Sequence, residues 1–532
     1  MRNLYGKTID LYPWQTEALA RVRDKSALVA APTGSGKTVV AYRWAGLLEE
    51  PRGRRVIFTA PIKALSNERY LELRALFGEE VGILTGDVKR NPEAPILCMT
   101  QEVYANRFCG LPQQRVIVDE IHYMVHNPDR ARAYAEGIAG THPESELLFL
   151  SATVDARRFL AYLSRLAARP IELVEQSRRP VPIHYLDREP SAKKLWEDLA
   201  PVLLFAFSYK GVMGLAGELY STAQGRMRPP LRERVRELAK HYRVDRPDLL
   251  RLATGGVAIY HGTLLYKEKL FVERLARENL LLAVAATDAL SLGINLPVKT
   301  VLFAQLARYI SGPIAKTEFL QMAGRAGRPN LQEAGYVGFL ETRFEARGFD
   351  TERLFRTLKK KALEPLRVRP LPSIQRILNQ TPVEEELRQL AALSFPALHP
   401  QELLASQRMI EISMDEIERS CRMLQRRARA GDRLLEVLRR IYFDEFTVAE
   451  NLGLAKMLVL EGKIDARQEI RRIRDRVRSE GEALKELLQF RRFLHSLASE
   501  EVAGADAVEH AIVTLDEFVL HPEALESSRL PA

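Results

Sequence analysis

The amino-acid sequence predicts two doubly wound, parallel-sheet α/β domains followed by a helical C-terminal region. Over the first 350 residues, short apolar runs alternate with amphipathic stretches, which is the pattern of parallel strands covered by helices on both faces. Beyond residue 350 the strand signal fades, and Leu, Arg, Glu and Ala recur with helical spacing. With 532 residues, the chain is also too long for a single hydrophobic core.

The first domain is expected over residues 1–176. Its apolar runs have the length of strands and end in small or polar residues. They are SALVAAP, RVIFTAP, APILCMT, RVIVDE and ELLFLSAT. In doubly wound sheets, ligands bind beyond the carboxyl ends of the strands. We therefore expect functional residues directly after these runs.

The second domain is expected over residues 177–350. It follows the break SRRPVPIHYL, in which Pro180 and Pro182 disfavour a continuous helix. Its strand candidates are PVLLFAFS, GVAIYHG, LLLAVAAT, KTVLFA and YVGFLET. The basic stretch at about 209–254, between the first two of these runs, is expected to be a mainly helical insertion.

The helical region is expected over residues 351–532. In RQEIRRIRDRVR, the apolar residues Ile470, Ile473 and Val477 recur on one helical face, with arginines on a neighbouring face. The run CRMLQRRARAGDRLLEVLRR contains seven arginines and could bind a polyanion, although a solvated helix face is the preferred interpretation.

Composition narrows the class of protein. The net charge of +10 and the pI near 9.4 favour a polyanionic partner without specifying one. The three cysteines, Cys98, Cys109 and Cys421, form no CxxC pair, which argues against a disulfide framework or a zinc site and favours a reducing compartment. No stretch approaches the roughly 20 apolar residues that span a bilayer. We therefore expect a cytoplasmic protein without a membrane segment.

The segment APTGSGKT, residues 31–38, follows the strand-like SALVA and predicts a phosphate-binding loop. A glycine-rich turn at a helix N-terminus directs backbone N–H groups toward phosphates. Lys37 is expected to contact the β and γ phosphates of ATP, and the Thr38 hydroxyl to bind Mg²⁺. The pattern normally begins with glycine, and Ala31 stands there instead. The residues expected to hold the phosphates are Thr33, Gly34, Ser35 and Gly36.

The stretch VIVDEIHYM, residues 116–124, places two carboxylates directly after a β-branched run. Taken alone, it could be a strand that ends in a polar turn. Beside a phosphate loop, Asp119 is expected to hold Mg²⁺ and Glu120 to activate the attacking water. A bound cation would offset the repulsion between the adjacent charges.

The segment QMAGRAGR, residues 321–328, supplies two arginines three positions apart. Arg325 and Arg328 are expected to act as arginine fingers on the transferring phosphoryl group, with Gln321 beside them. A surface helix with solvated arginines is the alternative.

With these motifs in hand, the chain resembles the DExH-type helicases of superfamily 2. DEIHYM, PIKALSN, RPVPIHY and QMAGRAGR are most similar to the exosome-associated, superkiller-type RNA helicases. The resemblance covers residues 1–350 and extends faintly over 373–395, SIQRILNQTPVEEELRQLAALSF. It implies that both α/β domains are RecA-like. Residues 396–532 depart from the family pattern, because they are too few for its arch insertion plus a full helical bundle.

The resemblance also implies roles for individual residues. Gln15, in YPWQTEAL, would contact the adenine, unless it is a solvated side chain beside a core-facing Trp14. Gly293 would sense the γ-phosphate, and His122, with Gln321 as its candidate partner across the cleft, would act with Ser151 and Thr153 to couple hydrolysis to domain movement. The residues implied to hold the sugar-phosphate backbone are Pro61, Lys63, Gly86, Thr100, Gly262 and Thr287.

Residues 303–319 occupy the position of this clade's strand-separating β-hairpin, with Ser311, Gly312 and Pro313 as its expected tip. A plain connecting loop is the alternative interpretation of this segment.

The sequence thus predicts an ATP-dependent helicase that uses Mg²⁺, translocates on single-stranded RNA and unwinds duplexes, 3′ to 5′ by resemblance. Its expected partner is a single-stranded or tailed duplex nucleic acid, with RNA favoured over DNA and no membrane involved. Two alternatives stay open: a DNA repair helicase of the same clade, and an ATP-switched clamp or remodeller that does not unwind processively. No protein partner is indicated.

Overall fold

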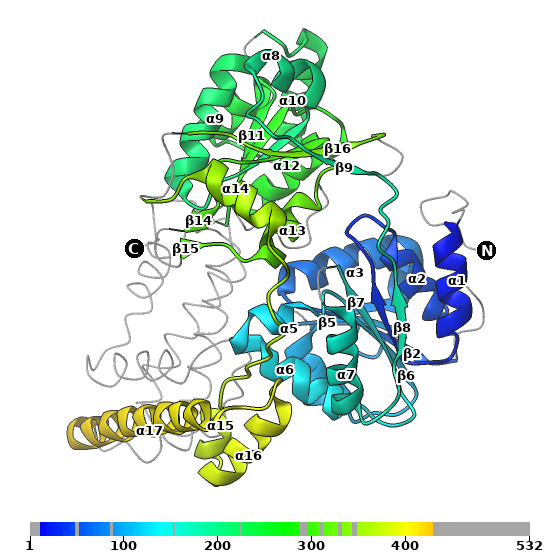
Figure 1. The fold of residues 1–532 in the computed structure, drawn as a ribbon, viewed down its shortest axis with the longest axis vertical. Helices are drawn as coiled ribbons and strands as arrows, with labels where there is room; N and C mark the ends of the chain where they lie inside the picture. Colours follow the sequence, from blue (N-terminus) through cyan, green and yellow to red (C-terminus); the bar gives the residue numbers. More distant parts are fainter. Residues whose placement is uncertain are drawn as a thin grey trace, which may run out of the picture.

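The computed structural model describes residues 11–47, 53–85, 89–152, 155–223, 225–262, 264–287, 296, 298–308, 312–327, 332–342 and 348–428. Within these ranges the chain forms two mainly parallel β-sheets flanked by helices, and a helical segment follows the second sheet (Figure 1). The predicted fold class of two RecA-like domains is confirmed, and helices follow over residues 351–428; the predicted helical stretches in 429–532, including most of the arginine-rich segments, lie outside the described residues. No helix in the same ranges is long and apolar enough to cross a membrane.

The first sheet has eight described strands in the order β4-β3-β5-β2-β6-β7-β1-β8. Neighbouring strands run parallel, apart from the antiparallel β3–β4 pair at one edge. Its strands are β1 (Ala27–Ala30), β2 (Arg55–Ala60), β3 (Val81–Leu84), β4 (Lys89–Arg90), β5 (Ile96–Thr100), β6 (Gln114–Val118), β7 (Glu146–Ser151) and β8 (Glu172–Glu175).

Both faces of this sheet are buried, which explains its nearly continuous apolar runs. In β1, for example, Leu28 joins one core cluster while Ala27 and Val29 join the cluster on the opposite face. Side chains of α1, α2 and α3 complete one cluster, and those of α6 and α7 complete the other. The helices are α1 (Pro13–Val22), α2 (Lys37–Trp44), α3 (Lys63–Phe77), α4 (Gln101–Val103), α5 (Tyr123–His126), α6 (Pro128–Ala139) and α7 (Ala156–Ala167), with a 3₁₀ turn at Gly78–Glu80 and a π-helical turn at Tyr104–Phe108.

The second sheet has six described strands in the order β11-β12-β10-β13-β16-β9, all parallel. They are β9 (Ile183–Tyr185), β10 (Val202–Phe205), β11 (Val257–Tyr260), β12 (Ala283–Ala286), β13 (Thr300–Phe303) and β16 (Gly335–Phe339). The helices are α8 (Ala192–Lys194), α9 (Tyr209–Ala223), α10 (Pro229–His241), α11 (Pro247–Thr254), α12 (Tyr266–Arg277), α13 (Lys316–Ala323) and α14 (Thr351–Lys360). Helix α8 continues into a π-helical turn at Leu195–Leu199. Helices α9, α10 and α11 occupy the basic stretch between β10 and β11.

A short hairpin lies within residues 303–319. β14 (Ala307–Arg308) pairs antiparallel with β15 (Gly312–Pro313), so this segment is not a plain loop. Gly312 and Pro313, which were expected at the tip, belong to the second strand instead. Ser311 and the other two connecting residues lie outside the described residues.

The segment after the second sheet contacts both domains. Phe355 and Leu358 of α14 enter the core of the second domain, whereas Leu366, Val368 and Leu393 enter a core cluster of the first. Figure 1 shows the chain running from α14 down to a helical group below α5 and α6. This group is made of α15 (Ile374–Leu378), α16 (Val383–Leu393) and α17 (Pro400–Ala428). The two RecA-like domains are thus connected twice, by this segment and by the linker between β8 and β9.

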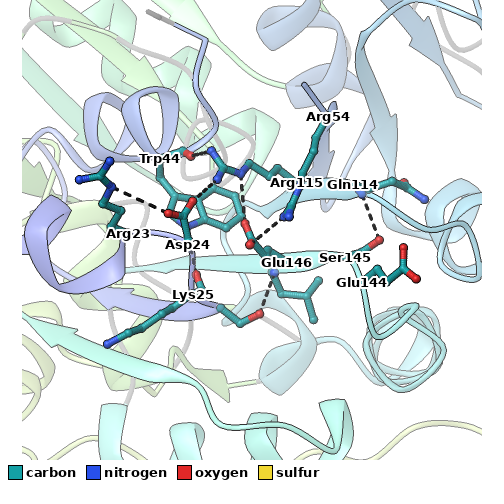
Figure 2. Close-up of polar contacts among 12 residues, drawn as sticks. Arg23, Asp24, Lys25, Trp44, Arg54, Gln114, Arg115, Glu144, Ser145 and Glu146 are labelled. Carbon is teal, nitrogen blue, oxygen red and sulfur yellow. Dashed lines mark hydrogen bonds and ion pairs between the residues drawn. The ribbon is translucent and has the colours of Figure 1, made fainter. Parts of the chain in front are cut away.

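An ion-pair network holds the amino-terminal edge of the first sheet together (Figure 2). Arg115, at the start of β6, pairs with Asp24 at 2.6 Å and with Glu146 of β7 at 3.0 Å, and it also donates to the Trp44 carbonyl. Arg54 pairs with the same Glu146 at 2.7 Å. These charges support the edge opposite to the carboxyl ends of the strands, and so leave the carboxyl ends available for a binding site.

Candidate functional site

The phosphate loop joins β1 to α2 and has the backbone that such a loop requires. Gly34 and Gly36 adopt left-handed φ angles of +79° and +88°, which non-glycine residues rarely tolerate. The Ser35 side chain is buried, and its Oγ has no hydrogen-bond partner among the described residues. An unpartnered polar atom inside a ring of backbone N–H groups fits a phosphate ligand.

Lys37, the first residue of α2, folds back over this loop. Its Nζ donates to the carbonyls of Ala31 at 2.6 Å and Pro32 at 3.1 Å. Burial lowers the pKa of Lys37, and the nearby carboxylates of Glu120 and Asp119 oppose that shift. The ammonium group therefore lies close to both the loop and the acidic pair, where it could contact a nucleotide phosphate bound in the loop.

The acidic pair follows β6 at the carboxyl edge of the sheet. The Asp119 N–H donates to the Thr59 carbonyl at 3.1 Å, and Glu120 has a left-handed φ of +49°. This conformation is strained for a residue other than glycine, and such strain is common at functional sites. Burial and the Glu120 charge raise the pKa of Asp119, while Arg69 and Lys37 lower it.

Glu120 lies beside two of the residues expected to couple hydrolysis to movement. Its Oε2 is 3.3 Å from His122 Nδ1, which in turn is 3.5 Å from the Ser151 Oγ at the end of β7. His122 and Ser151 are both buried. The structure therefore brings Glu120, His122 and Ser151 together from two neighbouring strands, whereas Thr153 lies outside the described residues.

Arg325 enters this site from the second domain. It follows the end of α13 and interacts electrostatically with Glu120 and Glu68, while burial lowers its pKa. The adjoining Gly324 packs against the phosphate loop so closely that a Cβ there would lie 3.2 Å from Thr33 Oγ1. The alternative of a solvated arginine at this position is therefore wrong. Gln321 lies on the same helix, and Arg328 lies outside the described residues.

Gln15 is buried rather than solvated, with 2% of its surface exposed. Its Nε2 donates to the Gly36 carbonyl at 3.1 Å, and its Oε1 accepts from the Tyr12 N–H at 2.8 Å. A Cβ at Gly36 would lie 2.4 Å from this amide nitrogen, so the loop and Gln15 fit only with glycine there. Gln15 thus connects α1 to the phosphate loop.

The described residues expected to hold a nucleic-acid strand lie at the carboxyl edges of the two sheets. Pro61 and Thr100 are buried at the ends of β2 and β5. Gly262 and Thr287 follow β11 and β12, and a Cβ at Gly262 would meet only open space. Lys63 begins α3, but its side chain is not among those described, and Gly86 and Gly293 lie outside the described residues.

Two arginines of this region were not predicted from the sequence. Arg69 of α3 pairs with Asp119 at 3.3 Å and with Glu72 at 2.7 Å, and it donates to the Tyr42 hydroxyl at 2.9 Å. Arg179 of the linker donates to backbone carbonyls on either side of Arg325. The i, i+3 spacing of Arg69 and Glu72 hinted at their ion pair, but no local pattern pointed to Asp119 or to Arg325.

A phosphate loop, an acidic pair and an arginine from a second RecA-like domain together form the arrangement expected of a helicase-type nucleotide site. Residues 12–160 match the model of the DEAD/DEAH box helicases, and residues 237–330 match the helicase conserved C-terminal domain. The chain therefore carries both helicase domains, and it is similar to the exosome-associated, superkiller-type RNA helicases.

Three relatives illustrate the match. The ATP-dependent RNA helicase mtr4 of Schizosaccharomyces pombe is 32% identical over 424 residues, which is 63% of this chain and 37% of that protein. The human exosome RNA helicase MTR4 is 32% identical over 414 residues, 62% of this chain and 39% of that protein. The human superkiller complex protein 2 is 29% identical over 406 residues, 61% of this chain and 32% of that protein. The matched region therefore spans less than two fifths of each relative.

Proposed function

We propose that this protein is an ATP-dependent RNA helicase that translocates 3′ to 5′ on single-stranded RNA and unwinds duplexes as its two RecA-like domains close on ATP. The observation that carries the proposal is the packing of Gly324, from the second domain, against Thr33 of the phosphate loop, which brings the adjoining Arg325 within electrostatic reach of Glu120. The names of the similar proteins support RNA as the substrate class.

In this proposal the phosphate loop, Thr33 to Gly36, binds the phosphates of ATP, and Lys37 contacts the β and γ phosphates. Thr38 and Asp119 would hold Mg²⁺, which neutralises phosphate charge when bound. Glu120 accepts the proton of the attacking water, with His122 beside it. Arg325 and Arg328 stabilise charge on the transferring phosphoryl group, and Gln321 and Gly293 complete the site.

The nucleic-acid strand is proposed to cross the carboxyl edges of both sheets. Pro61, Lys63 and Thr100 would contact it from the first domain, and Gly262 and Thr287 from the second, with Gly86 as a further contact. Backbone amides and small side chains suit phosphate contacts that do not depend on base sequence. Movement of one edge relative to the other would then advance the strand.

Two substitutions test the catalytic assignments. Glu120→Gln should retain ATP binding but lower kcat by about 10²- to 10⁴-fold, because it removes the general base without changing shape. Lys37→Ala should weaken nucleotide binding itself. Binding is measured with a fluorescent ATP analogue, and turnover by phosphate release. Wild-type turnover in Glu120→Gln would exclude the proposed role of Glu120.

The substrate and the outcome of hydrolysis are tested with nucleic acids of matched sequence. Single-stranded RNA should stimulate the ATPase more than the corresponding DNA at one stated salt concentration. A duplex with a 3′ tail should be unwound and one with a 5′ tail should not. Stronger stimulation by DNA would favour a repair helicase, and stimulation without unwinding would favour an ATP-switched clamp.

We also propose that the protein acts in the cytoplasm. Its described cysteines, Cys98 and Cys109, are free thiols, and free thiols suit a reducing compartment.

A further inference from the structure

Arg179 lies in the linker between the two RecA-like domains, directly before the Pro180 break. Its guanidinium donates to the carbonyl of Gly324 at 3.2 Å and to the carbonyl of Ala326 at 3.0 Å. These two carbonyls flank Arg325. One linker side chain therefore holds the backbone on both sides of the arginine that interacts electrostatically with Glu120.

The linker residues that follow Arg179 also contact the backbone next to Arg325. A Cβ at Gly327, which has a left-handed φ of +68°, would lie 2.8 Å from Val181 Cγ1 and from the Gly335 backbone. The Gly335 N–H donates to the Pro182 carbonyl at 2.8 Å, and the Gly327 N–H donates to the Val298 carbonyl at 3.1 Å. The backbone that carries Arg325 is thus fixed between the linker, Val298 ahead of β13, and the first residue of β16.

Arg179 also interacts electrostatically with Lys37, the lysine that follows the phosphate loop, and its charge contributes to the lowered pKa of Lys37. The Arg179 Nε is buried and has no hydrogen-bond partner among the described residues.

We propose that Arg179 is a positioning residue for ATP hydrolysis, which acts by holding residues 324–326 so that Arg325 is directed at the γ-phosphate. The inference rests on the proposed ATPase activity of this site. Because Arg179 belongs to the linker, it also ties the position of Arg325 to the path of the chain between the domains. A linker side chain with a purely structural role is the competing explanation.

The test compares Arg179→Met and Arg179→Lys with Arg178→Met, which removes a neighbouring exposed arginine and serves as the matched control. Arg179→Met should lower kcat by about 10- to 100-fold and change the KM for ATP little, because a misdirected arginine affects the transition state more than ground-state binding. Arg179→Lys should recover only part of the rate, since an ammonium lacks the planar geometry that directs both N–H bonds of Nη2 at the two carbonyls. Arg178→Met should behave as the unmodified protein.

A double-substitution cycle separates positioning from structure. If Arg179 acts through Arg325, then the double variant Arg179→Met/Arg325→Ala should have the same kcat as Arg325→Ala alone. If the two residues act independently, the fold-losses in kcat of the two single variants should multiply in the double variant. A multiplicative loss, or wild-type kcat in Arg179→Met, overturns the proposal.

A second readout does not depend on turnover. The affinity for ADP with aluminium fluoride, which mimics the transferring phosphoryl group, should fall in Arg179→Met while the affinity for ADP alone is retained, as measured by equilibrium titration. An equal loss of both affinities, together with a lower unfolding temperature, would assign Arg179 a structural role and overturn the proposal. Failure of the proposed function would appear separately, as normal hydrolysis in Glu120→Gln.

Discussion

The charges around Asp119 show how single residues make the site possible. Asp119 is adjacent to another carboxylate in partly buried surroundings, which raises its pKa. Arg69 pairs with it directly, and Lys37 approaches it from the phosphate loop. Arg69 also contacts the Tyr42 ring of α2, with its guanidinium carbon 5.9 Å from the ring centroid. One arginine thus connects the helix proposed to contact RNA, the phosphate-loop helix and the acidic pair.

Replacing Arg69 should therefore destabilise the first domain. Arg69→Met leaves Asp119, Glu72 and the Tyr42 hydroxyl without their cation, and removal of one partner of this partly buried cluster should cost about 1–3 kcal/mol. We expect an earlier urea transition of the first domain. Arg74→Met is the matched control, because Arg74 lies on the same helix and pairs with the exposed Glu79. It should leave the transition unchanged, and an equal loss in both variants would contradict the assignment.

At the scale of elements, the segment from α14 to α16 connects the two domains. The carboxylate of Glu364 accepts the N–H groups of Lys316 and Thr317, which caps the N-terminus of α13, the helix that leads to Arg325. Further along, the Leu393 carbonyl accepts a hydrogen bond from the Tyr162 hydroxyl of the first domain at 2.6 Å. The helical segment is therefore attached to both RecA-like domains.

Glu386 of α16 should be the critical residue of the attachment to the first domain. It is fully buried, and it pairs with Arg132 of α6 and, at 3.0 Å, with Arg376 of α15. Glu386→Gln leaves two arginines without their carboxylate, which should weaken the docking by about 3 kcal/mol. We expect faster proteolytic cleavage within residues 361–400, measured by mass spectrometry.

The control for this prediction lies on the same helix. Glu384 is exposed, so Glu384→Gln should be cleaved at the rate of the unmodified protein. Unchanged cleavage of Glu386→Gln would show that apolar contacts of Leu366, Val368 and Leu393 suffice to hold the segment.

At the scale of the whole molecule, the net charge of +10 suggests that RNA binding depends strongly on salt concentration. The proposed contacts instead suggest a weak salt dependence. Of the six residues proposed to hold the strand, Lys63 alone carries a charge. Each phosphate that a cation neutralises releases counterions. On a single strand, each such phosphate contributes about −0.7 to the slope of the logarithm of affinity against the logarithm of salt concentration. We therefore expect the logarithm of the RNA affinity to fall with the logarithm of salt concentration with a slope between about −0.7 and −1.5.

Lys63→Met should reduce this slope by about 0.7, whereas Lys89→Met, at the exposed edge of the first sheet, should not change it. Binding is measured by fluorescence anisotropy over a series of salt concentrations. A slope steeper than roughly −3 would mean that other Lys or Arg residues hold the strand.

Local sequence was sufficient to predict much of this protein. Strand-length apolar runs, the glycine turn before Lys37 and the carboxylates after β6 are patterns of neighbouring residues, and neighbouring residues decide periodicity and turn geometry. The carboxyl-edge location of Asp119 and Glu120 followed from the parallel sheet. The register of the short hairpin could not be predicted in this way, because Gly312 and Pro313 are compatible both with a hairpin tip and with the start of a strand.

Tertiary structure alone brought distant residues together. Arg69 and Asp119 are 50 positions apart, and Arg179 lies 145 positions from Gly324, so no local period relates them. The burial of Gln15 against Gly36 and the docking of Leu393 on the first domain likewise depend on how helices pack on the sheet. Sequence therefore identified the groups proposed to carry the chemistry, and the fold decided which cations and carboxylates pair with one another, because those contacts form only when the sheets and helices assemble.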